Sequence, residues 1–283
     1  MIKANSPLIN ASEVLRQMQT KDSVIVDARS GTDSYERFMS GHLENALHVD
    51  LDRDLSQKPL DPAIAGRHPL PDIKNFARLL GTIGITPHTS VIVYDDKSGA
   101  NAAARFWWML CAFGHKNVQV VDGGLDALKK KNVPLLSTLS FSTIKAPYPA
   151  QEWKLPTVDI DQVAQAVSMP NALVIDVRES YRFRGEREPI DLVAGHIPGA
   201  KNIPYINNLD AEGNFLPAET LKALYKNEIG NREIYNVIVH CGSGVTACHT
   251  LLSLGHAGMP GAKLYIGSWS QWSRSGRQIA TTF

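Results

Sequence analysis

The chain has 283 residues, of which 43% are hydrophobic, and its 29 basic and 28 acidic side chains give a formal net charge of +1. This composition is typical of a folded globular protein long enough for two domains, and it excludes a disordered or fibrous chain. The balanced charge predicts neither nucleic acid nor an anionic membrane as partner, and no segment approaches the ~20 apolar residues that cross a bilayer.

Cysteine usage and the first residues predict the compartment. Three cysteines are too few for a disulfide framework, and the start of the chain lacks the apolar core of a secretory signal. We therefore expect a cytoplasmic protein with free thiols.

Four short motifs occur twice, in the same order along the chain. The pairs are residues 24–29 and 173–178, 41–46 and 195–200, 91–95 and 237–241, and 120–124 and 264–268. The first pair consists of apolar, mostly β-branched runs that each end in Asp-x-Arg, which is typical of buried strands. A tandem duplication is the simplest explanation of four ordered matches.

Helical periodicity alternates with these strands in both halves. It predicts helices at residues 11–19, 73–80, 102–113, 160–167, 218–226 and 245–254. The alternation indicates an α/β fold with two tandem domains, each a mostly parallel sheet with helices on both faces. We place the domains at residues 1–136 and 158–283, joined by a linker at 137–157 that Trp153 anchors.

Cys241 lies where a predicted strand gives way to a glycine-rich turn and then a helix. Open α/β sheets bind ligands at the carboxyl ends of their strands. Gly242 and Gly244 would let backbone N–H groups turn inward as an anion-binding nest, and the helix N-terminus behind them favours a thiolate. Cys241 is therefore the candidate nucleophile, whereas Cys111 and Cys248 fit packed helices.

The loop Cys-Gly-Ser-Gly-Val-Thr at 241–246 resembles the active-site loop of the two-domain rhodanese superfamily, in particular its mercaptopyruvate sulfurtransferase branch. Further matches are His68-Pro69-Leu70-Pro71, Trp107-Trp108-Met109-Leu110, residues 195–204 and residues 267–272. The resemblance implies that Cys241 takes sulfur from 3-mercaptopyruvate as a persulfide. A thiol, cyanide or a thioredoxin-like protein would accept the sulfur, with neither cofactor nor metal. Asp95 stands at the equivalent position of the first half, which is then non-catalytic.

The resemblance also suggests the residues that bind the donor. In the loop these are Gly242, Ser243, Gly244, Val245 and Thr246. Ser243 fits two roles equally well, a hydrogen-bond donor to the leaving group or a cap of the following helix.

Outside the loop, Arg182 matches the first substrate arginine of the family. The second is unmatched because the chain has Pro189-Ile190-Asp191 there, so Arg187 or Arg184 is a candidate replacement. His42 matches a family histidine that acts with the loop serine. The Asp-x-Arg motifs, present in both halves, are expected to be structural.

Two alternative functions stay open. A thiosulfate sulfurtransferase would use the same persulfide chemistry; such relatives carry charged residues directly after the cysteine, where this chain has Gly242 and Ser243. A non-enzymatic sulfur-relay module would receive its persulfide from a protein partner. A cysteine-dependent phosphatase is disfavoured, because Ala247 stands where such enzymes need an arginine.

Overall fold

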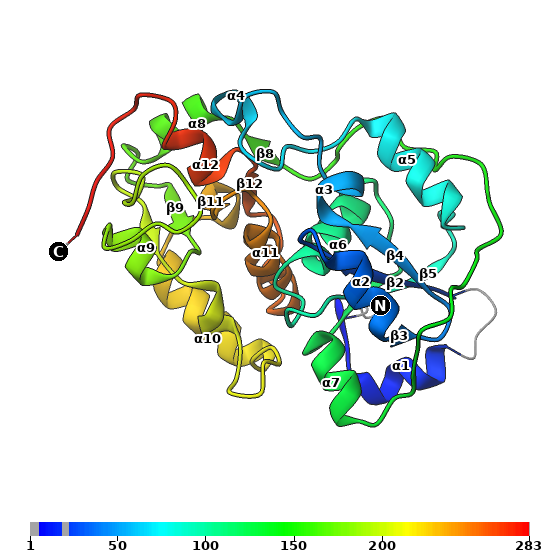
Figure 1. Cartoon of the computed structure of the whole chain (residues 1–283). Helices are drawn as coiled ribbons and strands as arrows, with labels where there is room; N and C mark the ends of the chain where they lie inside the picture. Colours follow the sequence, from blue (N-terminus) through cyan, green and yellow to red (C-terminus); the bar gives the residue numbers. More distant parts are fainter. Residues whose placement is uncertain (1–5, 19–22, 283) are drawn as a thin grey trace. The chain divides into compact units, whose positions relative to one another are not determined.

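The computed structural model describes residues 6–18 and 23–282 and confirms the α/β fold. The described residues form two five-stranded sheets with surrounding helices, and a small antiparallel sheet of β3 (His42–Leu43) and β7 (Leu135–Leu136) (Figure 1). By its contacts the chain divides into two compact units. Unit 1 contains Met1–Gln57, Pro71–Lys154 and Ala211–Phe215; unit 2 contains Lys58–Leu70, Leu155–Asp210 and Leu216–Phe283. The units thus differ from the linear domains expected from the sequence, because each includes a short segment from the other half of the chain.

Unit 1 is built on a five-stranded sheet with the order β1-β6-β5-β2-β4, in which all neighbours are parallel. Its elements are β1 (Leu8–Ile9), α1 (Ala11–Gln17), β2 (Ser23–Arg29), α2 (Ser34–Ser40), β3 (His42–Leu43), β4 (Ala46–Asp50), α3 (Leu51–Asp54), α5 (Ile73–Thr82), β5 (Ser90–Tyr94), α6 (Ala102–Ala112), β6 (Val118–Val121), α7 (Gly124–Lys130) and β7 (Leu135–Leu136). The helix expected at 11–19 ends at Gln17 here, and Gln19 lies outside the described residues.

Unit 2 repeats the same plan with the order β10-β9-β11-β12-β8, again parallel throughout. Its elements are α4 (Pro62–Ala65), β8 (Thr157–Val158), α8 (Ile160–Ala166), β9 (Leu173–Asp176), α9 (Ser180–Arg184), β10 (Lys201–Asn202), η1 (Tyr205–Asn208), α10 (Ala218–Ile229), η2 (Ile234–Asn236), β11 (Val237–His240), α11 (Thr246–His256), β12 (Lys263–Tyr265) and α12 (Ser268–Trp272). The matching strand orders, with β5 and β11 central, agree with the duplication.

The repeated Asp-x-Arg motifs form buried ion pairs inside each unit. Arg29 Nε lies 2.7 Å from Asp27 Oδ1, and Arg178 Nη2 lies 2.6 Å from Asp176 Oδ2. Burial opposes ionisation of Asp176, but the interactions with Arg178 and His240 together outweigh it and lower the pKa of that carboxyl. The second guanidinium also donates to the carbonyl of Gly195, so the pair ties its strand to the Gly-His turn. The prediction of a structural role is confirmed.

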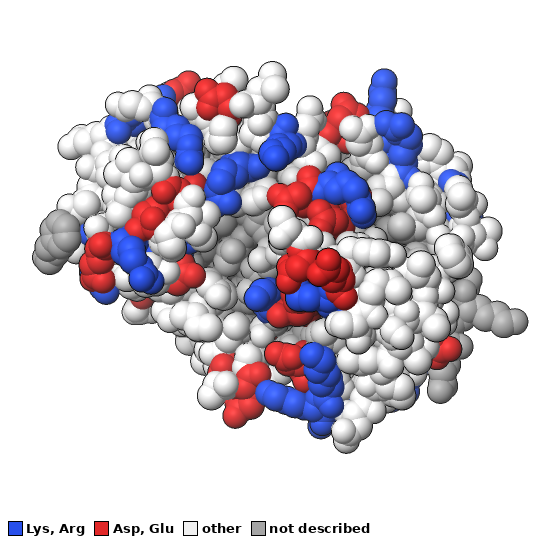
Figure 2. Space-filling view, viewed as in Figure 1, with Lys and Arg blue, Asp and Glu red and all other residues white. Residues whose placement is uncertain are grey.

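The linker packs on unit 1 through its aromatic side chains. Trp153 contacts Phe76 and Phe113, with ring centroids 5.7 and 4.6 Å apart. This confirms Trp153 as an anchor. No helix in the described part of the chain is long and apolar enough to cross a membrane. Acidic and basic side chains are interspersed on the face seen in Figure 2.

The segment at 58–70 is fixed to unit 2 by contacts with α12. Gly66 has φ +79°, and a Cβ built on it would lie 2.4 Å from the carbonyl oxygen of Gly267, so only glycine allows this approach. Gln271 Nε2 also donates to the carbonyl of Ile64. In unit 1, the N–H of Phe215 donates to Asp122 Oδ1 at 2.7 Å. Each half of the sequence thus contributes one short segment, 58–70 or 211–215, to the unit that the other half mainly forms.

The loop after β5 binds its own carboxylate. Asp95 accepts hydrogen bonds from the N–H groups of Lys97, Gly99, Asn101 and Ala103, at 2.7 to 3.2 Å. Burial raises the pKa of Asp95, and these four N–H groups oppose that rise. The side chain that stands in place of a cysteine therefore fills the N–H nest of the first half.

We expect Asp95→Ala to lower the free energy of unfolding by about 2–4 kcal/mol, because four backbone N–H groups lose their acceptor. Urea denaturation measures this loss. Asp126→Ala, which removes an exposed carboxylate on α7, is the control and should change stability by less than about 0.5 kcal/mol. Equal effects of the two substitutions would contradict the structural role of Asp95.

Candidate active site

Cys241 follows directly after β11, the central strand of its sheet. The carboxyl ends of parallel strands meet at one edge of a sheet, which is where such folds bind ligands. The Cys241 N–H donates to Ser268 Oγ at 3.2 Å, and its carbonyl accepts from Trp269 N at 3.0 Å. The first turn of α12 therefore holds the backbone of the candidate nucleophile, which is 3% exposed.

The two glycines of the loop serve different purposes. Gly244 has φ +75°, and a Cβ on it would lie 2.5 Å from the carbonyl oxygen of Ile266. Gly242 does not have a positive φ; instead, a Cβ there would lie 3.2 Å from Arg67 Nη2 and 3.4 Å from Arg182 Nη2. The expectation that both glycines are needed for backbone angles is therefore wrong for Gly242, which leaves room for guanidinium groups.

The loop carries backbone N–H groups available to an anion. Within the described residues, no hydrogen bond engages the N–H groups of Gly242, Ser243 or Val245. Val245 is the N-cap of α11 and no side chain caps this helix, whose first-turn N–H groups carry partial positive charge. The equivalent loop around Asp95 binds a carboxylate with the same kind of groups, which indicates what this loop can hold.

Ser243 contacts a histidine rather than capping the helix. Its Oγ lies 2.7 Å from His68 Nδ1, and the serine itself is buried. His68 belongs to the 58–70 segment of unit 2, far away in the sequence. An imidazole beside a hydroxyl can exchange a proton with it, so this pair can deliver or remove a proton next to Cys241.

Arg182 lies beside the loop within a cluster of carboxylates. Its guanidinium contacts Glu188 at 2.7 Å, Glu179 at 3.3 Å and Asp191 at 3.5 Å, and its side chain is 7% exposed. Burial disfavours its charge, but Glu188 and Glu179 together outweigh that cost and raise the pKa of Arg182. Burial likewise opposes ionisation of Glu188, whose pKa Arg182 lowers. Arg182 is thus a permanent cation near Gly242.

Two further arginines meet Arg182 at a shared carboxylate. Asp191, whose side chain is fully buried, binds Arg67 Nε at 3.0 Å and Arg274 Nη1 at 3.3 Å as well as Arg182. Glu188 and Glu179 also pair with Arg182, whereas Asp191 is the carboxylate that Arg67 and Arg274 share with it, so guanidinium groups are concentrated on this side of the loop. Such a place suits an anionic ligand.

Three of the proposed residues have other surroundings. Arg187 is exposed and stacks on the ring of Tyr181 at 5.3 Å, and Arg184 pairs with Glu186. His42 is fully buried in unit 1, stacked on Phe38, and both its ring nitrogens contact backbone carbonyls. The histidine that meets the loop serine is therefore His68, and the assignment of that role to His42 is corrected. Thr246 begins α11 and stays a candidate.

The residues that sequence reasoning missed are His68, Arg67, Arg274 and Ser268. His68 was visible as part of the His-Pro-Leu-Pro motif, but its partner lies in the other half of the chain. Ser268 has φ +53°, a strained angle that places its hydroxyl between Cys241 N and the carbonyl of Tyr265. The contact between Ser268 and Cys241 joins residues 27 positions apart, so the sequence around either residue does not predict it.

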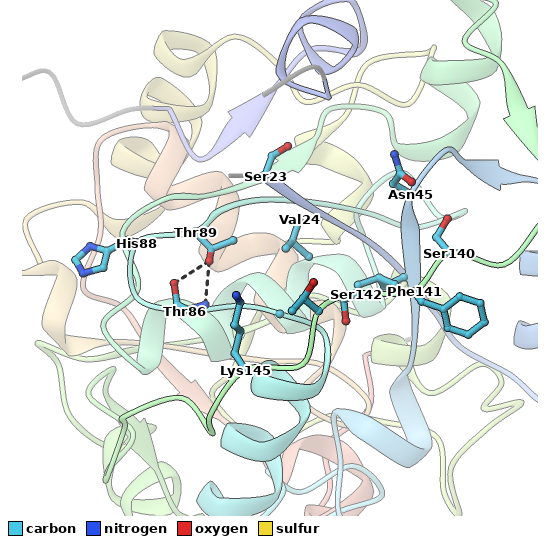
Figure 3. Close-up of a pocket in the computed structure, with 13 residues that line it drawn as sticks. Ser23, Val24, Asn45, Thr86, His88, Thr89, Ser140, Phe141, Ser142 and Lys145 are labelled. Carbon is cyan, nitrogen blue, oxygen red and sulfur yellow. Dashed lines mark hydrogen bonds between the residues drawn. The ribbon is translucent and has the colours of Figure 1, made fainter. Parts of the chain in front are cut away.

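A pocket lies elsewhere, in unit 1. It has a volume of about 560 Å³ and is lined by the starts of β2 and β4, the turn at 84–89 and residues 140–145 (Figure 3). These are the amino ends of the strands, at the edge opposite the Asp95 loop. Its walls are mainly small polar side chains, among them Thr86 and Thr89, which hydrogen-bond to each other.

The rhodanese-like domain family matches residues 10–131 and 159–275, one match in each half. The chain belongs to the rhodanese family. It is 36% identical to the probable 3-mercaptopyruvate sulfurtransferase of Pseudomonas aeruginosa, over 99% of both chains. It is also 36% identical to the putative thiosulfate sulfurtransferase SseB of Mycobacterium tuberculosis, over 94% of this chain and 93% of that protein.

Among solved structures, the 3-mercaptopyruvate sulfurtransferase SseA of Escherichia coli superposes with a TM-score of 0.78 at 29% identity. It covers 94% of this chain and 100% of that one. The chain is therefore an enzyme of the sulfurtransferase class, as its family and these relatives show.

Proposed function

We propose that the enzyme moves sulfur from 3-mercaptopyruvate to an acceptor through a persulfide on Cys241. The observation that carries this proposal is the place of Cys241 at the end of the central strand, in a loop with available N–H groups and with arginines at Gly242. The relatives named 3-mercaptopyruvate sulfurtransferases support the same donor. The Asp95 copy is non-catalytic, because its nest already holds a carboxylate.

In the first step, the Cys241 thiolate attacks the sulfur of the donor. A sulfur–sulfur bond forms, the carbon–sulfur bond breaks, and its electron pair leaves on the carbon as the enolate of pyruvate, which then takes up a proton. Hydrogen bonds to the developing anion lower this barrier. Ser243, with His68 behind it, is placed to supply that proton.

In the second step, a nucleophile removes the outer sulfur and restores the thiolate. Splitting the transfer into two displacements predicts ping-pong kinetics. The proposed acceptors are a small thiol, cyanide or a thioredoxin-like protein. We propose a cytoplasmic, reducing compartment, which suits the three free cysteines, Cys111, Cys241 and Cys248.

Along the sequence, the proposed domains are residues 1–136 and 158–283, joined by a linker at 137–157.

We expect His68→Ala and Ser243→Ala each to lower kcat/KM for 3-mercaptopyruvate about 10- to 100-fold, because each breaks the same proton path. The double variant should be little worse than either single one, since residues that act as a unit are not additive. Steady-state kinetics of all four proteins test this. Losses that multiply in the double variant would show that the two side chains act separately.

Thiosulfate is the second candidate donor, favoured by the relative named SseB and by the arginines at the loop. The chain has no charged residue directly after Cys241, which disfavours thiosulfate. This argument is weakened because Arg67 and Arg182, which are far from Cys241 in the sequence, place guanidinium groups near Gly242. Measuring kcat/KM for thiosulfate and for 3-mercaptopyruvate with the same acceptor decides which of the two is the better donor. We expect 3-mercaptopyruvate to be used more efficiently; a higher value with thiosulfate would overturn this choice.

A further inference from the structure

Arg67 is fixed to the candidate active site through its backbone. Its N–H donates to Ser270 Oγ at 3.0 Å, and the N–H of Ser270 donates to the carbonyl of Gly242 at 2.8 Å. The next residue, His68, contacts Ser243. Two consecutive residues of the 58–70 segment therefore present a guanidinium and an imidazole to consecutive residues of the Cys241 loop.

The side chain of Arg67 also lies next to the Cys241 loop, near Gly242. Asp191 accepts from its Nε at 3.0 Å and from its Nη2 at 3.4 Å, a two-point contact that fixes the guanidinium plane. That Nη2 lies 3.2 Å from a Cβ built on Gly242. Asp191, which is fully buried, thus holds Arg67 beside the residue that follows the nucleophile.

Arg67 is more available to a ligand than Arg182. All three nitrogens of the Arg182 guanidinium group bind carboxylates, and the side chain is 7% exposed. The Arg67 side chain is 25% exposed. Within the described residues its side-chain hydrogen bonds use Nε and Nη2, so Nη1 stays open.

We propose that Arg67 binds the carboxylate of the sulfur donor and that Asp191 is its positioning residue. The proposal rests on the function proposed above. Asp191 lies in the loop from which a second substrate arginine was expected, so the loop supplies a carboxylate that holds an arginine from elsewhere in the chain. The site thereby keeps two arginines near Gly242, and Arg182 is the one whose guanidinium nitrogens all bind carboxylates.

The test compares two donors that differ only in the carboxylate. 3-Mercaptopyruvate carries it, whereas mercaptoacetone has a methyl group in its place and keeps the thiol and the ketone. Arg67→Ala should lower kcat/KM about 10- to 100-fold for 3-mercaptopyruvate, the usual effect of losing a charged hydrogen bond, and change it less than about threefold for mercaptoacetone. The inhibition constant of pyruvate should rise similarly, and Arg67→Lys should recover part of the loss.

Two controls separate binding from folding and from the donor assignment. Arg184→Ala removes a neighbouring exposed arginine that pairs with Glu186 and should behave as wild type with both donors. Asp191→Asn should weaken use of 3-mercaptopyruvate selectively, since Arg67 loses its fixed orientation. Equal losses on both donors in Arg67→Ala, or none, would overturn the role of Arg67. Failure of the wild type itself on 3-mercaptopyruvate would overturn the proposed function instead.

Discussion

Replacement of Cys241 by serine is expected to lower kcat with 3-mercaptopyruvate by at least about 10⁴-fold. Serine keeps the size of the side chain, but its hydroxyl is not ionised at neutral pH and it cannot accept sulfur as a persulfide. The fold should be unaffected, because only the sulfur atom changes in a loop held by backbone contacts with α12. Steady-state assays with cyanide as acceptor measure the loss.

Cys111→Ser is the matched control for that experiment. Burial raises the pKa of the Cys111 thiol to about 12, so this sulfur is almost entirely protonated at neutral pH and is not a nucleophile. The control should keep kcat within about twofold of wild type. Substantial turnover by Cys241→Ser would mean that another group carries the sulfur.

The second large effect is expected for Gly244→Ala. The residue has φ +75°, and the added methyl would lie 2.5 Å from the carbonyl oxygen of Ile266, so the loop cannot keep its shape. We expect kcat/KM to fall more than about 100-fold and the free energy of unfolding to fall by about 2–4 kcal/mol. Kinetics and urea denaturation give the two values.

Gly258→Ala separates backbone strain from the clash. Gly258 also has a positive φ, +71°, but a Cβ there meets nothing within 4 Å. It should cost only the ~1–2 kcal/mol of a left-handed alanine and leave kcat/KM unchanged. If Gly244→Ala behaved in the same way, the close approach to Ile266 would not shape the loop.

The fold was predictable from the sequence because its signals are local and occur twice. Apolar runs such as 91–95 and 237–241 are buried strands, and the repeat placed Asp95 opposite Cys241 without a structure. What the repeat could not show is the exchange of short segments, since membership of 58–70 in unit 2 depends on contacts with α12. Domain boundaries predicted from composition divide the chain into continuous segments, so they cannot describe units that each contain a segment from the other half.

The candidate site was predictable only as far as its loop. Cys241 and Arg182 lie close to Gly242, as their motifs suggested. The Gly-His motif predicts His42 as the histidine partner of Ser243, whereas that partner is His68, which belongs to the other half of the sequence. The contact of Arg67 with Asp191 likewise joins the two halves, and no local pattern predicts it.

The most direct test of the central claim is the intact mass of the protein after incubation with 3-mercaptopyruvate and no acceptor. The wild type is predicted to gain the mass of one sulfur atom, to lose it on addition of cyanide, and to show no such gain as Cys241→Ser. An unchanged mass of the wild type, or the same gain in Cys241→Ser, would contradict a persulfide on Cys241.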